Sequence, residues 1–176
     1  MLLDFFHTVM ELKNIPRKGW KDKIGIPNPE SVADHSYSVT VMAMILSDFK
    51  KLDTQKILKM SLLHDLAESI IGDFTPGEIS KKDKIEIENE AMTKILSKLP
   101  SNLTNKYNEI WKEFQNQKSK EAILLHEIDR LEMALQAFKY GSEGYPQDKL
   151  EVFFLSAKKK IKSKEVLEIL DEISYK

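Results

Sequence analysis

Three short polar groups interrupt apolar, helix-like segments and could together hold a metal ion. His35 lies near the start of one segment, His64 and Asp65 are adjacent in a second, and Asp129 interrupts an apolar stretch of a third. Burying an ionised carboxylate costs several kcal/mol unless a cation or hydrogen bonds compensate. Two imidazoles and two carboxylates form a ligand set for Mn, Co, Zn, Fe or Mg, with positions left for water and substrate. From spacing alone, the alternative is that they only cap and hydrogen-bond neighbouring helices.

Two further acids follow the His64–Asp65 pair. Because helix neighbours lie three and four positions apart, we expect Glu68 on the same helix face as His64 and Asp65. Asp73 comes shortly afterwards, next to Gly72. The flanking leucines are apolar, so this polar face is expected to border the core.

A loop near the amino end carries rare residue types. Arg17 and Arg130 are the only arginines among 27 basic residues, and Trp20 is one of two tryptophans. An arginine kept in a glycine-containing loop of a lysine-rich chain suggests a planar, bidentate donor for phosphate. Trp20 could stack on a base or wall off the pocket. The alternative is that Arg17 pairs with a surface carboxylate and Trp20 packs on the core.

Helices must position these residues, because apolar residues recur at helical spacing and no segment alternates as a half-buried strand does. Ser31, Ser80 and Ser119 are predicted helix caps, as is Asp53 or Thr54. We therefore predict an all-α fold with a loop over 15–29. The expected helices span about 2–15, 32–46, 54–70, 81–99, 101–114, 120–140, 148–160 and 164–174.

Composition limits the class of protein. The 176 residues are 41% hydrophobic and 31% charged, which predicts one globular domain over 1–176. A net charge of −1 favours neither nucleic acid nor a membrane surface as a partner. The absence of cysteine excludes disulfides and sulfur-ligated zinc. The longest apolar run is far below the ~20 residues of a membrane span, and the amino end lacks a signal-peptide pattern, so we expect a cytoplasmic location.

The order of these motifs resembles the HD superfamily of metal-dependent phosphohydrolases. The more specific stretches are similar to its 5′-deoxynucleotidase group, and the resemblance covers nearly the whole chain. In the bacterial branch the loop arginine and tryptophan are adjacent, whereas here Lys18 and Gly19 separate them, as in the eukaryotic branch. The stretches that carry the resemblance are 16–20, 29–35, 64–68, 71–73 and 129–132.

The resemblance implies a single all-α HD domain, a helical bundle with a divalent metal between helices. It implies hydrolysis of a 2′-deoxyribonucleoside 5′-monophosphate to nucleoside and phosphate, and it suggests a homodimer. The implied metal ligands are His35, His64, Asp65 and Asp129. The implied substrate-binding residues are Arg17, Lys18 and Trp20. Glu68 and Asp73 are implied as proton-transfer groups or ligands of a second cation.

Two alternatives remain open. The first is an HD phosphohydrolase that acts on a triphosphate or a cyclic nucleotide. A triphosphate would need added basic residues near the pocket, where only Arg17 and Lys18 are obvious. The second is a nucleotide- or metal-binding interaction protein without turnover, but binding alone would not require proton-transfer groups.

The remaining candidate residues are interpreted as structural. Arg130 is expected to be an inter-helix salt-bridge partner, and Lys158–Lys160 are expected to form a solvated helix end. His7 is expected to be a packing or surface residue, and His126 is not expected to be a ligand.

Overall fold

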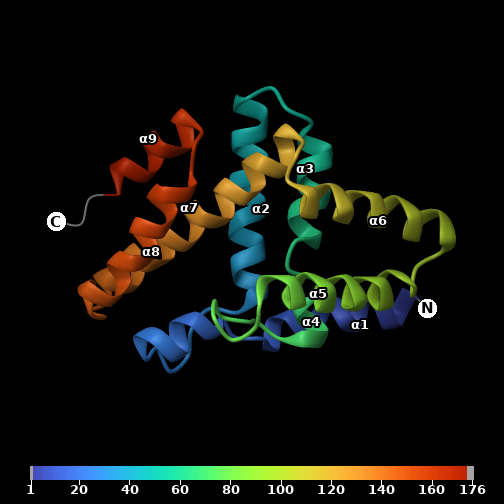
Figure 1. Cartoon of the computed structure of the whole chain (residues 1–176), viewed down its shortest axis with the longest axis horizontal. Helices are drawn as coiled ribbons and strands as arrows, with labels where there is room; N and C mark the ends of the chain where they lie inside the picture. Colours follow the sequence, from blue (N-terminus) through green and yellow to red (C-terminus); the bar gives the residue numbers. More distant parts are fainter. Residues whose placement is uncertain (1, 174–176) are drawn as a thin grey trace.

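The computed structural model describes residues 2–173, which form α-helices and no β-strand (Figure 1). The predicted all-α fold is therefore confirmed. A 3₁₀ helix, η1 (Leu12–Asn14), and a π-helix, η2 (Trp20–Ile24), precede the second α-helix. The α-helices are α1 (Leu2–Glu11), α2 (Val32–Phe49), α3 (Thr54–Leu63), α4 (Glu68–Ile71), α5 (Lys81–Leu96), α6 (Ser101–Asn116), α7 (Lys120–Ser142), α8 (Gln147–Lys160) and α9 (Lys164–Glu172).

The helix starts follow the predicted caps. The Ser31 hydroxyl accepts a hydrogen bond from the Asp34 amide at 3.2 Å, and the Asp34 carboxylate accepts one from the Ser31 amide at 2.9 Å. This reciprocal capping box fixes the first turn of α2 and so places His35 there. The Ser80 and Ser119 hydroxyls each accept one hydrogen bond, from the Asp83 and Ala122 amides, and so cap α5 and α7. The predicted end of the last helix at Ser174 lies outside the described residues.

The helix predicted over 54–70 is interrupted, which is a correction to the sequence pattern. α3 ends at Leu63, residues 64–67 form turns, and α4 begins at Glu68. The Ser61 carbonyl accepts a hydrogen bond from His64 Nδ1 at 2.6 Å, and such side-chain bonds compete with the helical backbone ladder. α4 then stops at Gly72, whose φ of 78° suits a residue without a Cβ.

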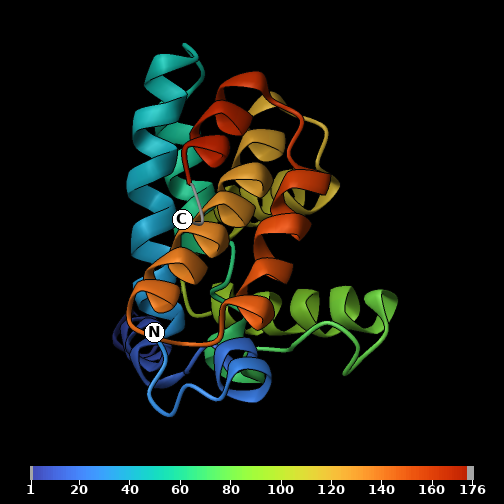
Figure 2. The same cartoon turned by 90° about the vertical axis from the view of Figure 1, so that its left-hand side faces the viewer.

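α7 is the central helix of the fold. It contacts α2 and α3 on one side and α8 on another, and Figure 2 shows it between α2 and α8. The main core is apolar and unites side chains such as Val39, Ile57 and Ile128. A smaller, separate cluster joins the η2 region to α7 and α8; its buried members are Trp20, Ile24, Ile26, Ala137, Tyr140 and Leu150. Within residues 2–173, no helix combines the length and apolarity that a membrane span requires.

Candidate metal centre and pocket

Two histidine rings face each other where α2 meets the end of α3. The Nε2 atoms of His35 and His64 lie 3.4 Å apart, and both rings are buried. His64 Nδ1 lies 2.6 Å from the Ser61 carbonyl oxygen, which can only accept, so this nitrogen carries the proton. His35 Nδ1 lies 2.6 Å from the Glu132 carboxylate, which favours the same tautomer. In the neutral rings, both Nε2 lone pairs are therefore directed at one region.

Two carboxylates complete this cluster. Asp65 Oδ2 lies 3.3 Å from His64 Nε2 and 3.6 Å from His35 Nε2. Asp129 Oδ1, from α7, lies 3.3 Å from His35 Nε2. His35, His64 and Asp129 offer ligand atoms that all lie within 4.8 Å of one another. The structure thus brings the four predicted ligands together from three separated parts of the chain.

The electrostatics of the cluster call for added positive charge. Burial and Arg17 lower the pKa of His35, but hydrogen bonds with Asp129 and Glu132 outweigh them and raise it to about 10. Burial raises the pKa of Asp129, yet His35 holds it below its usual range. A divalent cation would take the place of the second proton of His35, and the two Nε2 atoms together with the carboxylates form a donor set that fits such an ion.

Arg17 lies beside the cluster and its side chain is only 11% exposed. Its Nη1 atom is 3.5 Å from Asp65 Oδ2 and 3.8 Å from Asp73 Oδ1. Burial opposes the charged form of Arg17, but Asp65 and then Asp73 outweigh it and raise its pKa. The Arg17 amide donates to the Glu30 carbonyl at 2.9 Å, which ties the loop to the residue before the α2 cap. Arg17 therefore pairs with site carboxylates and not with a surface acid.

Of the other two predicted loop residues, Trp20 lines the pocket and Lys18 does not. The Lys18 amide donates to Asp73 at 2.7 Å, but its ammonium pairs with Glu78, and Lys18 is outside the pocket lining. Trp20 is 2% exposed and packs against Phe153 with ring centroids 4.3 Å apart. Its Nε1 donates to Glu30 at 2.9 Å. Trp20 thus forms a wall of the pocket and leaves no open ring face for a stacked base.

Glu68 is a buried acid without a full set of partners. It is 4% exposed and lines the pocket, and its Oε2 atom has no hydrogen-bond partner among the described residues. Burial raises its pKa well above the usual value, and the nearby charges of Asp65 and Asp73 raise it further. A buried carboxyl with a raised pKa beside a candidate metal centre has the properties of a proton-transfer group.

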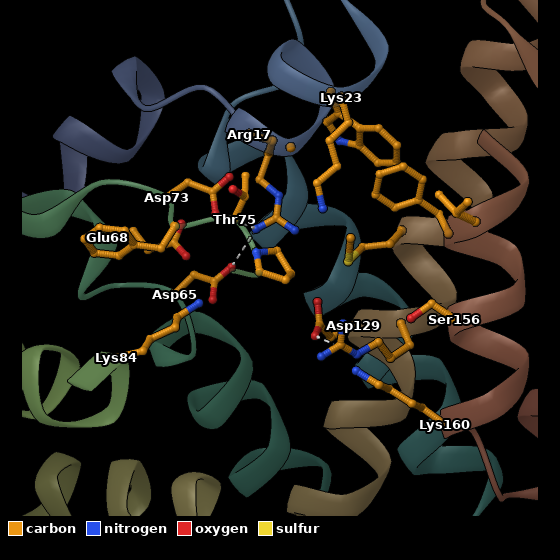
Figure 3. A pocket seen from close by; sticks show the side chains of 18 residues that line it. Arg17, Lys23, Asp65, Glu68, Asp73, Thr75, Lys84, Asp129, Ser156 and Lys160 are labelled. Atoms are coloured by element: carbon orange, nitrogen blue, oxygen red, sulfur yellow. Dashed lines mark hydrogen bonds and ion pairs between the residues drawn. The ribbon is translucent and has the colours of Figure 1, made fainter. Parts of the chain in front are cut away.

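The pocket beside the cluster has a volume of about 440 Å³, and Figure 3 shows the side chains that line it. Met133, Val152 and Phe153 supply apolar lining, and Lys23, Lys84 and Lys160 supply basic lining that the sequence did not indicate. The predicted solvated helix end is confirmed, because Lys158, Lys159 and Lys160 are all exposed. Lys158 pairs with Asp171 at 2.8 Å, and Lys160 also lines the pocket.

Arg130 also differs from its prediction. Among residues 2–173 its ion pair is with the adjacent Asp129, Nε to Oδ2 at 4.0 Å, and not with another helix. It lines the pocket. His126, by contrast, stacks on Phe114 with ring centroids 4.3 Å apart and bonds to the Phe114 carbonyl, away from the ligand cluster. His7 is exposed.

Comparison with known sequences identifies relatives over nearly the whole chain. A family model described as HD domain matches residues 9–173, a range that includes every site residue above. The 5'-deoxynucleotidase HDDC2 of Homo sapiens is 36% identical over 173 residues, covering 98% of this chain and 84% of that protein. The 5'-deoxynucleotidase hdd1 of Schizosaccharomyces pombe is 38% identical over 144 residues, covering 79% of this chain and 72% of that protein.

Solved structures show the same fold. The PH0347 protein from Pyrococcus horikoshii OT3 superposes with a TM-score of 0.81 at 32% sequence identity, covering 97% of both chains. A conserved hypothetical protein from Pyrococcus furiosus gives a TM-score of 0.79 at 32% identity, covering 97% of this chain and 98% of that chain. The arrangement of helices around the pocket is therefore shared with these proteins.

Proposed function

This chain belongs to the HD-domain family, and from that premise we propose that the pocket lined by the Arg17 loop, the segment 65–76, α7 and α8 is its active site. The chain is a 5′-deoxynucleotidase, a hydrolase that converts a 2′-deoxyribonucleoside 5′-monophosphate to the deoxynucleoside and phosphate. The observation that carries the site assignment is the convergence of two Nε2 atoms and two carboxylates next to a buried arginine.

A divalent ion held by His35, His64, Asp65 and Asp129 would supply a Lewis acid and lower the pKa of a bound water. Arg17 neutralises charge on the phosphate oxygens, since its guanidinium lies beside Asp65 at the pocket. Asp73 positions this loop, because its two oxygens contact Arg17 and the Lys18 amide. Glu68 takes the proton of the attacking water or gives one to the leaving 5′-oxygen. We assign no second cation to Glu68 and Asp73.

The apolar wall has a separate task in this proposal. Met133, Val152 and Phe153 line the pocket next to the basic and acidic groups. Apolar side chains suit the faces of a base or a deoxyribose, while the charged groups suit the phosphate. The volume of about 440 Å³ is in the range of small-molecule sites.

The test is a phosphate-release screen after chelator treatment, with several divalent ions and with nucleoside mono-, di- and triphosphates that carry or lack the 2′-hydroxyl. We expect release from deoxynucleoside monophosphates only when a divalent ion is restored. Elemental analysis of Asp65→Ala and Asp129→Ala should show metal loss, whereas the surface control Asp171→Ala should retain metal. Parent-like metal content in both ligand variants contradicts the proposed site. Absence of turnover with every nucleotide and ion leaves a binding protein as the better interpretation.

We also propose a homodimer, and α2 offers a surface for it. Tyr37, Val41, Ile45 and Phe49 are exposed and recur every four residues, so they form one apolar stripe along the helix. A second copy of the chain would cover this stripe. Light scattering should give twice the chain mass for the parent and a lower mass for Ile45→Glu. A cytoplasmic location and a single domain over 1–176 complete the proposal.

A further inference from the structure

Both arginines of the chain line this one pocket, although every other basic residue is lysine. Each lies beside a different acid of the proposed metal centre. Arg17 Nη1 is 3.5 Å from Asp65 Oδ2, and Arg130 Nε is 4.0 Å from Asp129 Oδ2. Two planar cations therefore approach the centre from two different elements, the amino-terminal loop and α7.

Lys160, at the end of α8, extends the positive charge around Arg130. Figure 3 shows Lys160 and Ser156 reaching from α8 towards Asp129 on α7. Within residues 2–173, no carboxylate lies within 4.0 Å of the Lys160 ammonium, and the Ser156 side chain makes no hydrogen bond. The nearby charge of Arg130 lowers the pKa of Lys160, and burial adds to this effect. Two cations and a free hydroxyl thus share one side of the pocket.

The charge of the pocket exceeds what one phosphate requires. Five basic and four acidic side chains line it. A divalent ion would raise the formal sum from +1 to +3, whereas a phosphate monoester brings at most −2. Arg17 already has two carboxylates within 4.0 Å. Arg130 shares Asp129 with the proposed metal ion, and Lys160 beside it has no ion pair within residues 2–173, so the excess charge on this side of the pocket lies at these two residues.

We propose that Arg130, Lys160 and Ser156 form a second phosphate subsite, so that the pocket binds nucleotides carrying a phosphate group in addition to the one at the metal centre. This inference rests on the proposed function, which places the first phosphate beside Arg17. The three side chains offer a planar guanidinium, an ammonium and a hydroxyl, and all of these can donate to the acceptor oxygens of a phosphate. The second phosphate could be the β-phosphate of a 5′-diphosphate or a 3′-phosphate.

Calorimetric titration of the metal-loaded protein tests the subsite independently of turnover. The probes are non-hydrolysable 5′-phosphonate analogues of deoxyadenosine monophosphate, of the diphosphate, and of the 3′,5′-bisphosphate. We expect at least one added phosphate to lower the Kd about tenfold or more, the scale of one charge-assisted hydrogen bond. The arm that shows the gain identifies which phosphate is bound. Equal affinity for all three analogues overturns the proposal.

Variants connect the gain to these side chains. Arg130→Gln and Lys160→Gln should each reduce the gain, which is the ratio of the Kd for the monophosphate analogue to the Kd for the analogue with the added phosphate. Lys159→Gln removes the same charge from the neighbouring exposed position and should keep the gain. If Lys159→Gln reduces the gain as much as Lys160→Gln does, the gain comes from the general positive charge of this surface, and the subsite is wrong. If Arg130→Gln weakens the monophosphate analogue equally, Arg130 serves the phosphate at the metal centre and the second subsite is wrong.

Phosphate release from deoxyadenosine monophosphate by the parent is measured alongside. A parent that hydrolyses this nucleotide but shows no gain contradicts the subsite alone. A parent that shows the gain without hydrolysis contradicts the proposed function alone.

Discussion

Replacing Glu132 with alanine is expected to weaken metal binding about 10- to 100-fold, although Glu132 is not one of the proposed ligands. Its Oε2 atom accepts a hydrogen bond from His35 Nδ1 at 2.6 Å, with side chains 3% and 0% exposed. Removing the acceptor leaves a buried donor unpaired, which costs about 1–3 kcal/mol and matches one to two powers of ten in affinity. The ring of His35 then loses the contact that directs its Nε2 atom towards Asp129.

The assay is competition for Co²⁺ between the chelator-treated protein and a chromophoric chelator. Glu132→Gln should recover most of the affinity, because its amide oxygen can still accept from Nδ1. Glu127→Ala is the matched control. Glu127 is another buried glutamate of α7, but it accepts hydrogen bonds from the Lys162 and Ser163 amides, so its loss should lower stability and not metal affinity. A parent-like Kd in folded Glu132→Ala refutes the reasoning.

Three further substitutions test other parts of the site. Arg17→Lys should keep the metal and lower kcat/KM about ten- to hundredfold in steady-state assays, because an ammonium cannot form a bidentate pair with phosphate. Unchanged kinetics would argue against contact between Arg17 and the phosphate. Glu68→Gln should lower kcat by ~10²–10⁴ in single-turnover assays while substrate affinity is retained, and parent-like rates would exclude proton transfer. In the metal-free parent, the raised pKa of Glu68 means that stability falls as pH rises from the ordinary glutamate range towards that raised value; chemical denaturation should show a weaker pH slope in Glu68→Gln. Trp20→Phe removes the bond to Glu30 and should lower the free energy of unfolding by about 1–3 kcal/mol in urea titrations, with no change expected if that bond is dispensable.

The sequence indicated the features that depend on local physics. Ser31 and Asp34 are three residues apart, and this spacing alone predicts the capping box that places His35 at the start of α2. The convergence of the candidate ligands was also predictable, because a buried acid such as Asp129 requires a cation or hydrogen bonds wherever it lies. Glu132 could have been found as well. It follows Asp129 by three positions, so a helix places both on one face.

Other features depend on packing between distant segments and gave no local signal. The interruption after Leu63 follows from the bond between the His64 ring and the Ser61 carbonyl, which periodicity does not report. Lys160 enters the pocket because of how α8 lies against α7, whereas its neighbours Lys158 and Lys159 have the same local sequence. The direction of the Lys18 side chain is set by Glu78, sixty positions further along the chain.

The small apolar cluster around Trp20 determines how firmly the rim of the pocket is attached to α7 and α8. Its buried side chains are separate from the main core and join the segment that follows Arg17 to α7 and α8. Regions with few buried apolar contacts exchange amide protons through local openings that need less free energy than global unfolding. The ligand cluster, in contrast, borders the main core through α2, α3 and α7. We therefore expect amide exchange to be faster in the segment around Trp20 than in α2, α3 and α7, so that the rim of the pocket would open while its floor stays assembled.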